Sequence, residues 1–214
     1  MIIVMTREFW ESEGSDFTVS PVDVSTNPNG VIDPFVTVFI RVEFSFSSLI
    51  DDLSEIDGVE IAPRDSLHIT VKMGREVAKD ELPDISKKIE SSLEEFTPFT
   101  IALRGVNVFP NCVYIPAVDE EHTLESVHQS LCSISEFIEG EFEGLDYIPH
   151  MTLAKFSSWD VDTSELYSVL SDYQDKDWGE IEVSRVYLVK DIPSENGVFP
   201  QFDVVRDFTL EPEH

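Results

Sequence analysis

The chain has 214 residues, of which 42% are hydrophobic and 15 are phenylalanine, a composition that indicates a folded protein rather than a disordered one. Its 43 acidic and 14 basic residues give a formal net charge of -29. No apolar run approaches the roughly 20 residues that span a bilayer, and the two cysteines match no metal-ligand spacing, so we expect a soluble cytoplasmic protein.

The acidic residues are spread along the whole chain and do not form a tail. At about 1 M salt the electrostatic screening length falls to roughly 3 Å, so repulsion within such a chain largely disappears. We therefore interpret the acidity as halophilic adaptation to a salty cytoplasm. The alternative is an acidic interaction surface, which usually takes the form of a block or tail.

Residues 1–34 are rich in Ser, Asp, Asn, Thr, Gly and Pro and have no sustained hydrophobic period, which predicts a flexible N-terminal extension. A run of β-branched and aromatic residues then begins at Phe35. The spacing of apolar residues predicts, in chain order, a strand over 35–42, a helix over 46–56, a strand over 66–73, a helix over 80–96, a strand over 99–109 and a strand over 112–115.

The second half of the chain repeats this order of elements. It predicts a helix over 124–138, a strand over 147–156, a helix over 166–173, and strands over 181–189 and 202–210. We therefore expect an α+β protein with a two-lobed, duplicated fold, in which mostly antiparallel sheets are flanked by helices around a central cleft. The predicted lobes are about 35–110 and 111–210 within one domain over 35–210.

Two predicted strands carry a similar motif, Leu67-His68-Ile69-Thr70-Val71 and Pro149-His150-Met151-Thr152-Leu153. Side chains alternate between the two faces of a strand, so each histidine shares a face with the threonine two residues later, and the apolar residues occupy the other face. Each half of the chain would thus contribute one histidine and one hydroxyl to a shared site.

A third match to the pattern, His128-Gln129-Ser130, lies within the predicted helix over 124–138. Residues two apart on a helix do not face each other, so these side chains cannot form a joint site. We expect His128 to be a surface residue of the helix.

Residues 63–74 and 148–156, which contain the two motifs, resemble the paired strands of the 2H phosphoesterase superfamily. Within it they are most similar to the LigT-like RNA 2',3'-cyclic phosphodiesterases, historically called 2'-5' RNA ligases. The likeness covers about residues 35–210. A lysine stands at position 155 where many relatives carry arginine, and lysine cannot make a bidentate phosphate contact.

The resemblance implies an enzyme that hydrolyses 2',3'-cyclic phosphodiesters at RNA ends or on nucleotides to 2'-phosphates, with possible reverse 2'-5' RNA ligation. It implies that His68 and His150 carry the proton transfers, with His68 favoured as acid and His150 as base. Near neutral pH one neutral and one protonated imidazole can perform both transfers without a metal or other cofactor. Thr70 and Thr152 would donate hydrogen bonds to the phosphate oxygens, whose charge grows in the transition state.

Basic residues near the motifs are the remaining candidates for substrate binding. Lys72 has the parity of His68 and Thr70 and could reach a phosphate, whereas Lys155 has the opposite parity to His150 and reaches the cleft only if its strand twists or ends. Weaker candidates are Arg64, Arg75 and Arg104. Each of these cations could equally be an ordinary surface residue.

Two alternatives to an RNA phosphodiesterase stay open at this point. One is a phosphodiesterase for small cyclic nucleotides such as ADP-ribose 1'',2''-cyclic phosphate. The other is a nucleotide- or RNA-binding module without catalysis, although both motifs retain their threonines beside the histidines. In each case the expected partner is RNA or a nucleotide and not a membrane, and we expect a monomer.

Overall fold

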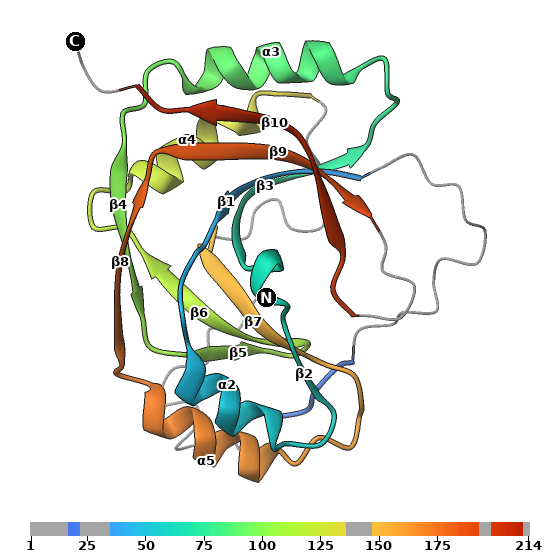
Figure 1. Cartoon of the computed structure of the whole chain (residues 1–214), viewed down its shortest axis with the longest axis vertical. Helices are drawn as coiled ribbons and strands as arrows, with labels where there is room; N and C mark the ends of the chain where they lie inside the picture. Colours follow the sequence, from blue (N-terminus) through green and yellow to red (C-terminus); the bar gives the residue numbers. More distant parts are fainter. Residues whose placement is uncertain (1–16, 22–34, 136–146, 193–197, 212–214) are drawn as a thin grey trace.

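The structure is a computed structural model, and it describes residues 17–21, 35–135, 147–192 and 198–211. Ten strands form one sheet in the order β10-β9-β1-β3-β7-β6-β4-β8, with β2 added beside β7 and β5 beside β6 (Figure 1). Each recorded strand pairing is antiparallel. The predicted α+β fold with mostly antiparallel strands is confirmed.

The strands in chain order are β1 Phe35–Arg41, β2 Val59–Ile61, β3 His68–Glu76, β4 Phe99–Arg104, β5 Asn107–Phe109, β6 Cys112–Val118, β7 His150–Phe156, β8 Asp177–Val183, β9 Arg185–Ile192 and β10 Gln201–Thr209. The helices are α2 Ser47–Ser54, α3 Leu82–Leu93, α4 Thr123–Cys132 and α5 Thr163–Tyr173, with a 3-10 turn, η3, at Arg64–Ser66.

The order of the strands is symmetrical about the central pair β3 and β7. From β3 the sheet continues through β1 to β9, and from β7 it continues through β6 to β4. β4 therefore lies among strands of the second half of the sequence, and β9 and β10 lie beside strands of the first half. The lobe limits near residue 110 stay a prediction, but strands from both halves of the chain contribute to each side of the sheet.

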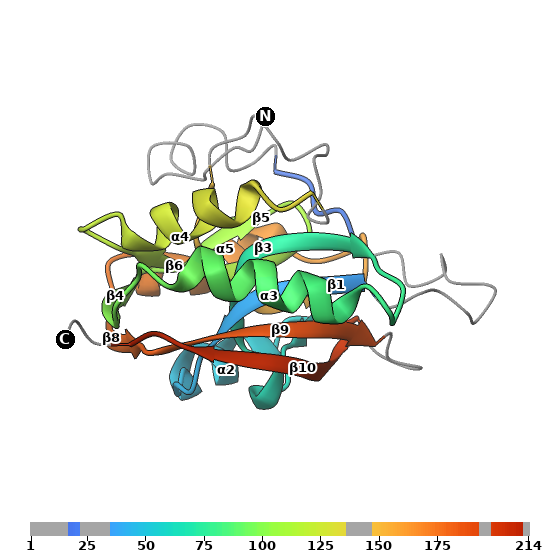
Figure 2. The ribbon, with the colours of Figure 1, turned by 90° about the horizontal axis from the view of Figure 1, so that it is seen from above.

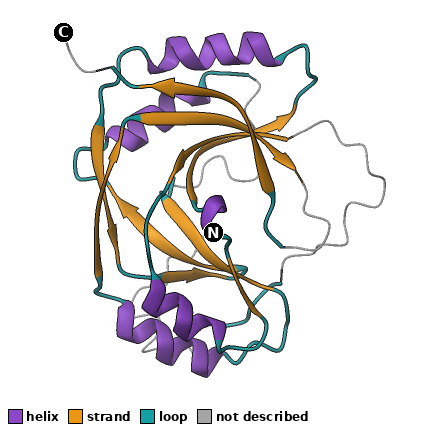
Figure 3. Ribbon diagram, in the orientation of Figure 1, coloured by secondary structure: helices purple, strands orange, loops and turns teal. Residues whose placement is uncertain are grey.

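The helices form two pairs that lie at opposite ends of the molecule, with the strands between them (Figure 3). α3 contacts α4, and these two helices pack against β10 and β3, respectively (Figure 2). α2 contacts α5 and β2 at the other end. None of the helices in the described ranges is long and apolar enough to span a membrane.

Local sequence signals account for the ends of the helices. Pro83 occupies the first turn of α3, where its missing N–H has no helical partner to lose. The carboxylate of Asp162 accepts hydrogen bonds from the backbone N–H groups of Ser164 and Glu165 and so caps α5. The predicted helix over 124–138 ends at Cys132 in the structure, and its residues 136–138 lie outside the described residues.

Two predicted strands are each divided in the structure. The run over 99–109 becomes β4 and β5, because Gly105 between them has a φ of 67° and donates its N–H to the carbonyl of Lys176. A Cβ at Gly105 would lie 2.4 Å from the carbonyl oxygen of Gln174, so only glycine fits this turn. The run over 181–189 is divided at Ser184, where the chain passes from β8, beside β4, to β9, beside β1.

Part of the predicted N-terminal extension contacts the core. Phe17 and Val19 are buried in the main hydrophobic cluster, and the N–H of Ser20 donates to the carbonyl of Pro110. The other residues of 1–34 lie outside the described ranges. A flexible extension over 1–34 therefore stays a prediction.

Candidate active site

The two motifs lie side by side at the centre of the sheet, where Ile69 of β3 pairs with Met151 of β7. Both of these side chains are fully buried in the core. Their neighbours along each strand project to the other face, which places both histidines and both threonines together. If this antiparallel register continues by one residue on each side, it places His68 opposite Thr152 and His150 opposite Thr70.

The two imidazoles are held in the same way. Nδ1 of His68 lies 2.7 Å from the carbonyl oxygen of Ser66, and Nδ1 of His150 lies 2.7 Å from the carbonyl oxygen of Ile148. A carbonyl can only accept, so Nδ1 carries the proton in both rings, and Nε2 is the basic nitrogen of each neutral imidazole. No described residue forms a hydrogen bond to either Nε2, so both nitrogens can contact a substrate.

Each imidazole also contacts two aromatic rings. The centroid of His68 lies 4.9 Å from that of Phe39 on β1 and 4.8 Å from that of Phe202 on β10. His150 has equivalent neighbours in Tyr114 on β6, at 5.3 Å, and Phe109 on β5, at 5.1 Å. The aromatic rings restrict the orientation of both imidazoles and exclude water from around them.

A β-bulge follows the threonine in each motif. Phe39 pairs with Thr70 but Val38 pairs with Lys72, so Val71 is an extra residue in β3. In β7 the extra residue is Leu153, because the pairing of β6 moves from Thr152 to Ala154 in one step. A bulge shifts the alternation of side chains by one residue. Residues beyond each bulge therefore project to the face opposite that expected from simple parity.

The bulge in β7 brings Lys155 to the face of the histidines. Lys155 pairs with Cys112, which lies two residues from Tyr114 and shares its face. Its ammonium group donates to the carbonyl of Val198 at 3.0 Å and lies 4.9 Å from the centroid of Phe199. Burial lowers the pKa of Lys155. From the sequence, Lys155 was expected to reach the cleft only if its strand twists or ends. In the structure the bulge at Leu153 changes the face on which Lys155 lies.

The bulge in β3 has the opposite effect on Lys72. Lys72 pairs with Val38, whose side chain is fully buried in the core, so the two side chains share the face opposite His68. Lys72 itself is 7% exposed. The parity expected for Lys72 is wrong, and the side chain on the cleft face after this bulge is Met73, which is 44% exposed.

Of the weaker basic candidates, Arg104 lies on β4 and is ion-paired with Glu120 at 3.3 Å. Arg64 lies in η3, directly before the first motif strand. The side chain of Arg75 lies outside the described residues.

Burial shifts the proton affinities in the site. Burial, opposed by the hydrogen bond to Ser66 and assisted by the nearby charges of His150 and Lys155, lowers the pKa of His68 to about 4. Burial likewise lowers the pKa of His150. Both imidazoles are therefore neutral near pH 7 in the free protein. The influence of His150 and Lys155 on His68 also indicates that the three groups lie close together.

Cys112, Tyr114 and Asp191 are further polar residues on the face of the histidines that the sequence did not predict. Burial raises the pKa of the Cys112 thiol to about 11, so this cysteine is a poor nucleophile near neutral pH. Burial also raises the pKa of Asp191 to about 6. The Tyr114 hydroxyl and the Asp191 Oδ1 atom are buried and have no hydrogen-bond partner among the described residues. Such atoms are costly unless a ligand or water satisfies them.

His128 is not the surface residue expected from the sequence. Its ring is half-buried, stacks on Tyr147 at 4.1 Å, and donates from Nδ1 to the carbonyl of Val71 at 2.6 Å. Tyr147 donates its hydroxyl to the carbonyl of Thr70 at 2.9 Å. These two side chains bind the backbone carbonyls at the bulge of β3, where the regular ladder is interrupted. They therefore fix the backbone that carries Thr70.

The comparisons with known proteins agree with this geometry. A family model described as the 2'-5' RNA ligase superfamily matches residues 43–192. The chain belongs to this superfamily. The resemblance to the 2H phosphoesterases inferred from the two motifs is thus confirmed.

Two similar curated proteins are archaeal and are both named RNA 2',3'-cyclic phosphodiesterase. The protein of Methanocaldococcus jannaschii is 26% identical over 72% of this chain and 86% of its own. That of Methanothermobacter thermautotrophicus is 27% identical over 75% of this chain and 89% of its own.

Solved structures share the fold of this superfamily member. The protein TT0787 of Thermus thermophilus is 19% identical, with a TM-score of 0.60 over 84% of this chain and 100% of its own. Escherichia coli LigT complexed with 3'-AMP is 13% identical, with a TM-score of 0.59 over 84% of this chain and 99% of its own.

The hydrogen bond from Tyr147 to the bulge leads to a test of local structure. Tyr147→Phe leaves the Thr70 carbonyl without this donor, which costs about 1–3 kcal/mol of unfolding free energy and speeds amide hydrogen exchange in β3. The matched control is Tyr173→Phe, which removes an exposed bond to Asp52. Unchanged exchange in β3 of the Tyr147 variant would contradict a fixing role for this bond.

Proposed function

We propose that the protein is a metal-independent phosphodiesterase that opens 2',3'-cyclic phosphates at RNA ends or on nucleotides and yields 2'-phosphates. One observation carries this proposal: two imidazoles whose Nε2 atoms form no hydrogen bond with a described residue share one face of neighbouring strands with two threonine hydroxyls. The names of the archaeal relatives and membership of the superfamily support the same reaction.

The mechanism follows from these groups. Nε2 of one histidine takes a proton from water as its oxygen attacks phosphorus, and Nε2 of the other gives a proton to the departing 3' oxygen. The P–O3' bond breaks, so the phosphate remains on the 2' oxygen. Thr70 and Thr152 donate to the non-bridging oxygens, and Lys155 contributes positive charge from the same face. A ribose 5'-hydroxyl in place of water would give 2'-5' ligation.

The acid must obtain its proton when the substrate binds. Both imidazoles are neutral near pH 7 in the free protein, because burial lowers the pKa of each. A cyclic phosphodiester carries one negative charge, and an opposite charge within about 4–6 Å raises the pKa of an imidazole. The bound phosphate thus promotes protonation of the histidine that faces the leaving oxygen.

The two histidines are the direct test of this mechanism. In molar KCl with EDTA, the protein should hydrolyse uridine 2',3'-cyclic phosphate, and His68→Ala and His150→Ala should each lower kcat by about 10²–10⁴-fold. The matched control is His122→Asn, because His122 is exposed and its left-handed backbone tolerates asparagine. Loss of wild-type activity in EDTA, or full activity in either alanine variant, contradicts the proposal.

We assign the acid to His68 and the base to His150, as in the family resemblance; burial lowers the pKa of both imidazoles in the free protein. A substrate whose leaving group needs no acid distinguishes this assignment from the reverse one. Catechol cyclic phosphate releases a phenolate, so His68→Ala should recover most of its lost rate on this compound, and His150→Ala should not. Recovery by the His150 variant alone would reverse the assignment.

Two alternatives have distinct outcomes in the same assays. Faster turnover of ADP-ribose 1'',2''-cyclic phosphate than of an RNA end would indicate a small-nucleotide phosphodiesterase. Calorimetric binding of the cyclic phosphate with no product would indicate a binding module. The two Nε2 atoms, neither of which is hydrogen-bonded by a described residue, favour catalysis, since binding alone does not require two matched bases.

We also propose that the protein works as a monomer in a reducing, salt-rich cytoplasm. Cys112 and Cys132 are both free thiols, and the net charge is -29. Screening of this charge should raise the melting temperature between 0.1 and about 2 M KCl. An equal molar concentration of sucrose serves as the control, and a melting temperature that does not rise with KCl would contradict halophilic adaptation.

A further inference from the structure

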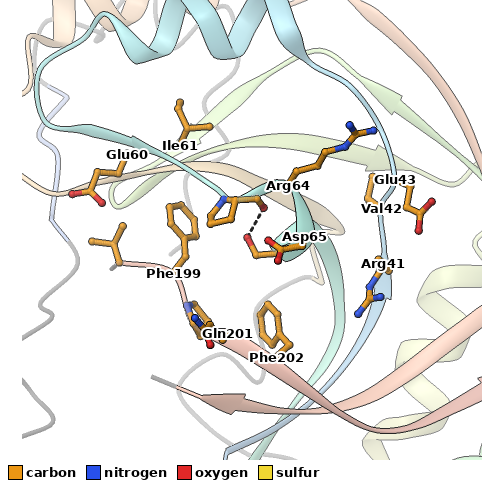
Figure 4. Close-up of a pocket in the computed structure, with 14 residues that line it drawn as sticks. Arg41, Val42, Glu43, Glu60, Ile61, Arg64, Asp65, Phe199, Gln201 and Phe202 are labelled. Atoms are coloured by element: carbon orange, nitrogen blue, oxygen red, sulfur yellow. Dashed lines mark hydrogen bonds between the residues drawn. The ribbon is translucent and has the colours of Figure 1, made fainter. Parts of the chain in front are cut away.

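A large pocket borders the two motifs on the His68 side. Its volume is about 1130 Å³, slightly above the roughly 300–1,000 Å³ typical of small-ligand sites. Figure 4 shows its side chains, which come from β1, β2, η3, β10 and the loops next to them. The charged and aromatic residues of its lining include Arg41, Glu43, Glu60, Arg64, Asp65 and Phe199.

Residues that line the pocket contact residues of the candidate active site. Arg41 pairs with His68 across β1 and β3, and Phe202 contacts the His68 ring at 4.8 Å. On another side of the pocket, Phe199 lies beneath the ammonium group of Lys155. The pocket therefore lies beside both His68 and Lys155 of the candidate active site.

Two arginines of the pocket are available to an anion. Arg41 lies 5.2 Å from the centroid of Tyr187, a contact that leaves its N–H donors for another group. Neither Arg41 nor Arg64 has a carboxylate partner among the described residues. In Figure 4 the two guanidinium groups lie toward β1, and Phe199 lies on the opposite side of the pocket.

The acidic residues of the pocket limit which part of a ligand it can bind. Glu43, Glu60 and Asp65 would repel a ligand that carried many phosphates. Carboxylates can instead accept hydrogen bonds from ribose hydroxyls and base amino groups. Phe199 offers a ring on which a base can stack. Two arginines, several carboxylates and an aromatic ring together suit one nucleoside with one phosphate.

We propose that this pocket binds the nucleotide on the 5' side of the one that carries the cyclic phosphate. Arg41 and Arg64 bind the phosphate between the two nucleotides, and the upstream base lies against Phe199. This inference rests on the proposed function and extends it, because it makes an RNA end, and not a mononucleotide, the preferred substrate.

The test compares three compounds at one salt concentration: uridine 2',3'-cyclic phosphate, the dinucleotide UpU ending in the same group, and that dinucleotide with a neutral methylphosphonate link. We expect kcat/KM for the dinucleotide to exceed that for the mononucleotide by about tenfold or more, as for one charge-assisted contact. The methylphosphonate and the variant Arg64→Ala should each remove most of this preference. Arg104→Ala, which removes an ion-paired arginine outside the pocket, should keep it.

Equal kcat/KM for the mononucleotide and dinucleotide, or an unchanged preference in the Arg64 variant, would overturn the pocket assignment while the proposed reaction stands. Failure to hydrolyse any of the three compounds would instead refute the proposed function. Calorimetric dissociation constants for the same compounds then test the pocket alone, because binding of the upstream nucleotide does not require turnover. If none of the compounds is hydrolysed, equal affinities of the mononucleotide and dinucleotide would still overturn the pocket assignment.

Discussion

The antiparallel contact between Ile69 and Met151 determines the arrangement of the site. This one buried pair brings strands from the two halves of the chain together and sets the register in which each histidine faces a threonine of the other motif. A shift of either strand by one residue would turn its own histidine and threonine into the core, at a prohibitive cost in desolvation. The core contacts of these two residues therefore fix the chemistry on the opposite face.

The two motif strands share three structural features. The histidine donates to a carbonyl two residues earlier, an aromatic residue of the next strand contacts its ring, and a bulge follows the threonine. The equivalent hydrogen bonds give the two imidazoles the same tautomer, but the residues after the two bulges differ. Lys155 brings a cation to the cleft face, whereas the corresponding side chain of β3 is Met73, so the positive charge in the site lies on one side.

The sequence predicted the elements and the pairing of the motifs, because period and parity are local properties of a strand or helix. It missed the bulges, since the extra residue in each strand is defined only by the neighbouring strand. Without the bulges, strand parity placed Lys72 on the face of the histidines and Lys155 on the opposite face. The structure has the reverse arrangement. His128 was misjudged for a related reason: its contacts with Val71 and Tyr147 join segments far apart in the chain. The division at Ser184 likewise depends on which strands lie beside β8 and β9.

The central claim is that both imidazoles carry their proton on Nδ1 and offer Nε2 to one phosphate. Nitrogen-15 NMR of the histidine rings measures this most directly, since the two tautomers have distinct ring-nitrogen shifts. At pH 7 the account predicts the Nδ1–H tautomer for His68 and His150, and movement of both Nε2 signals when a nucleoside 2'-phosphate is added. The Nε2–H tautomer on either ring, or a response of only one ring to the phosphate, would contradict it.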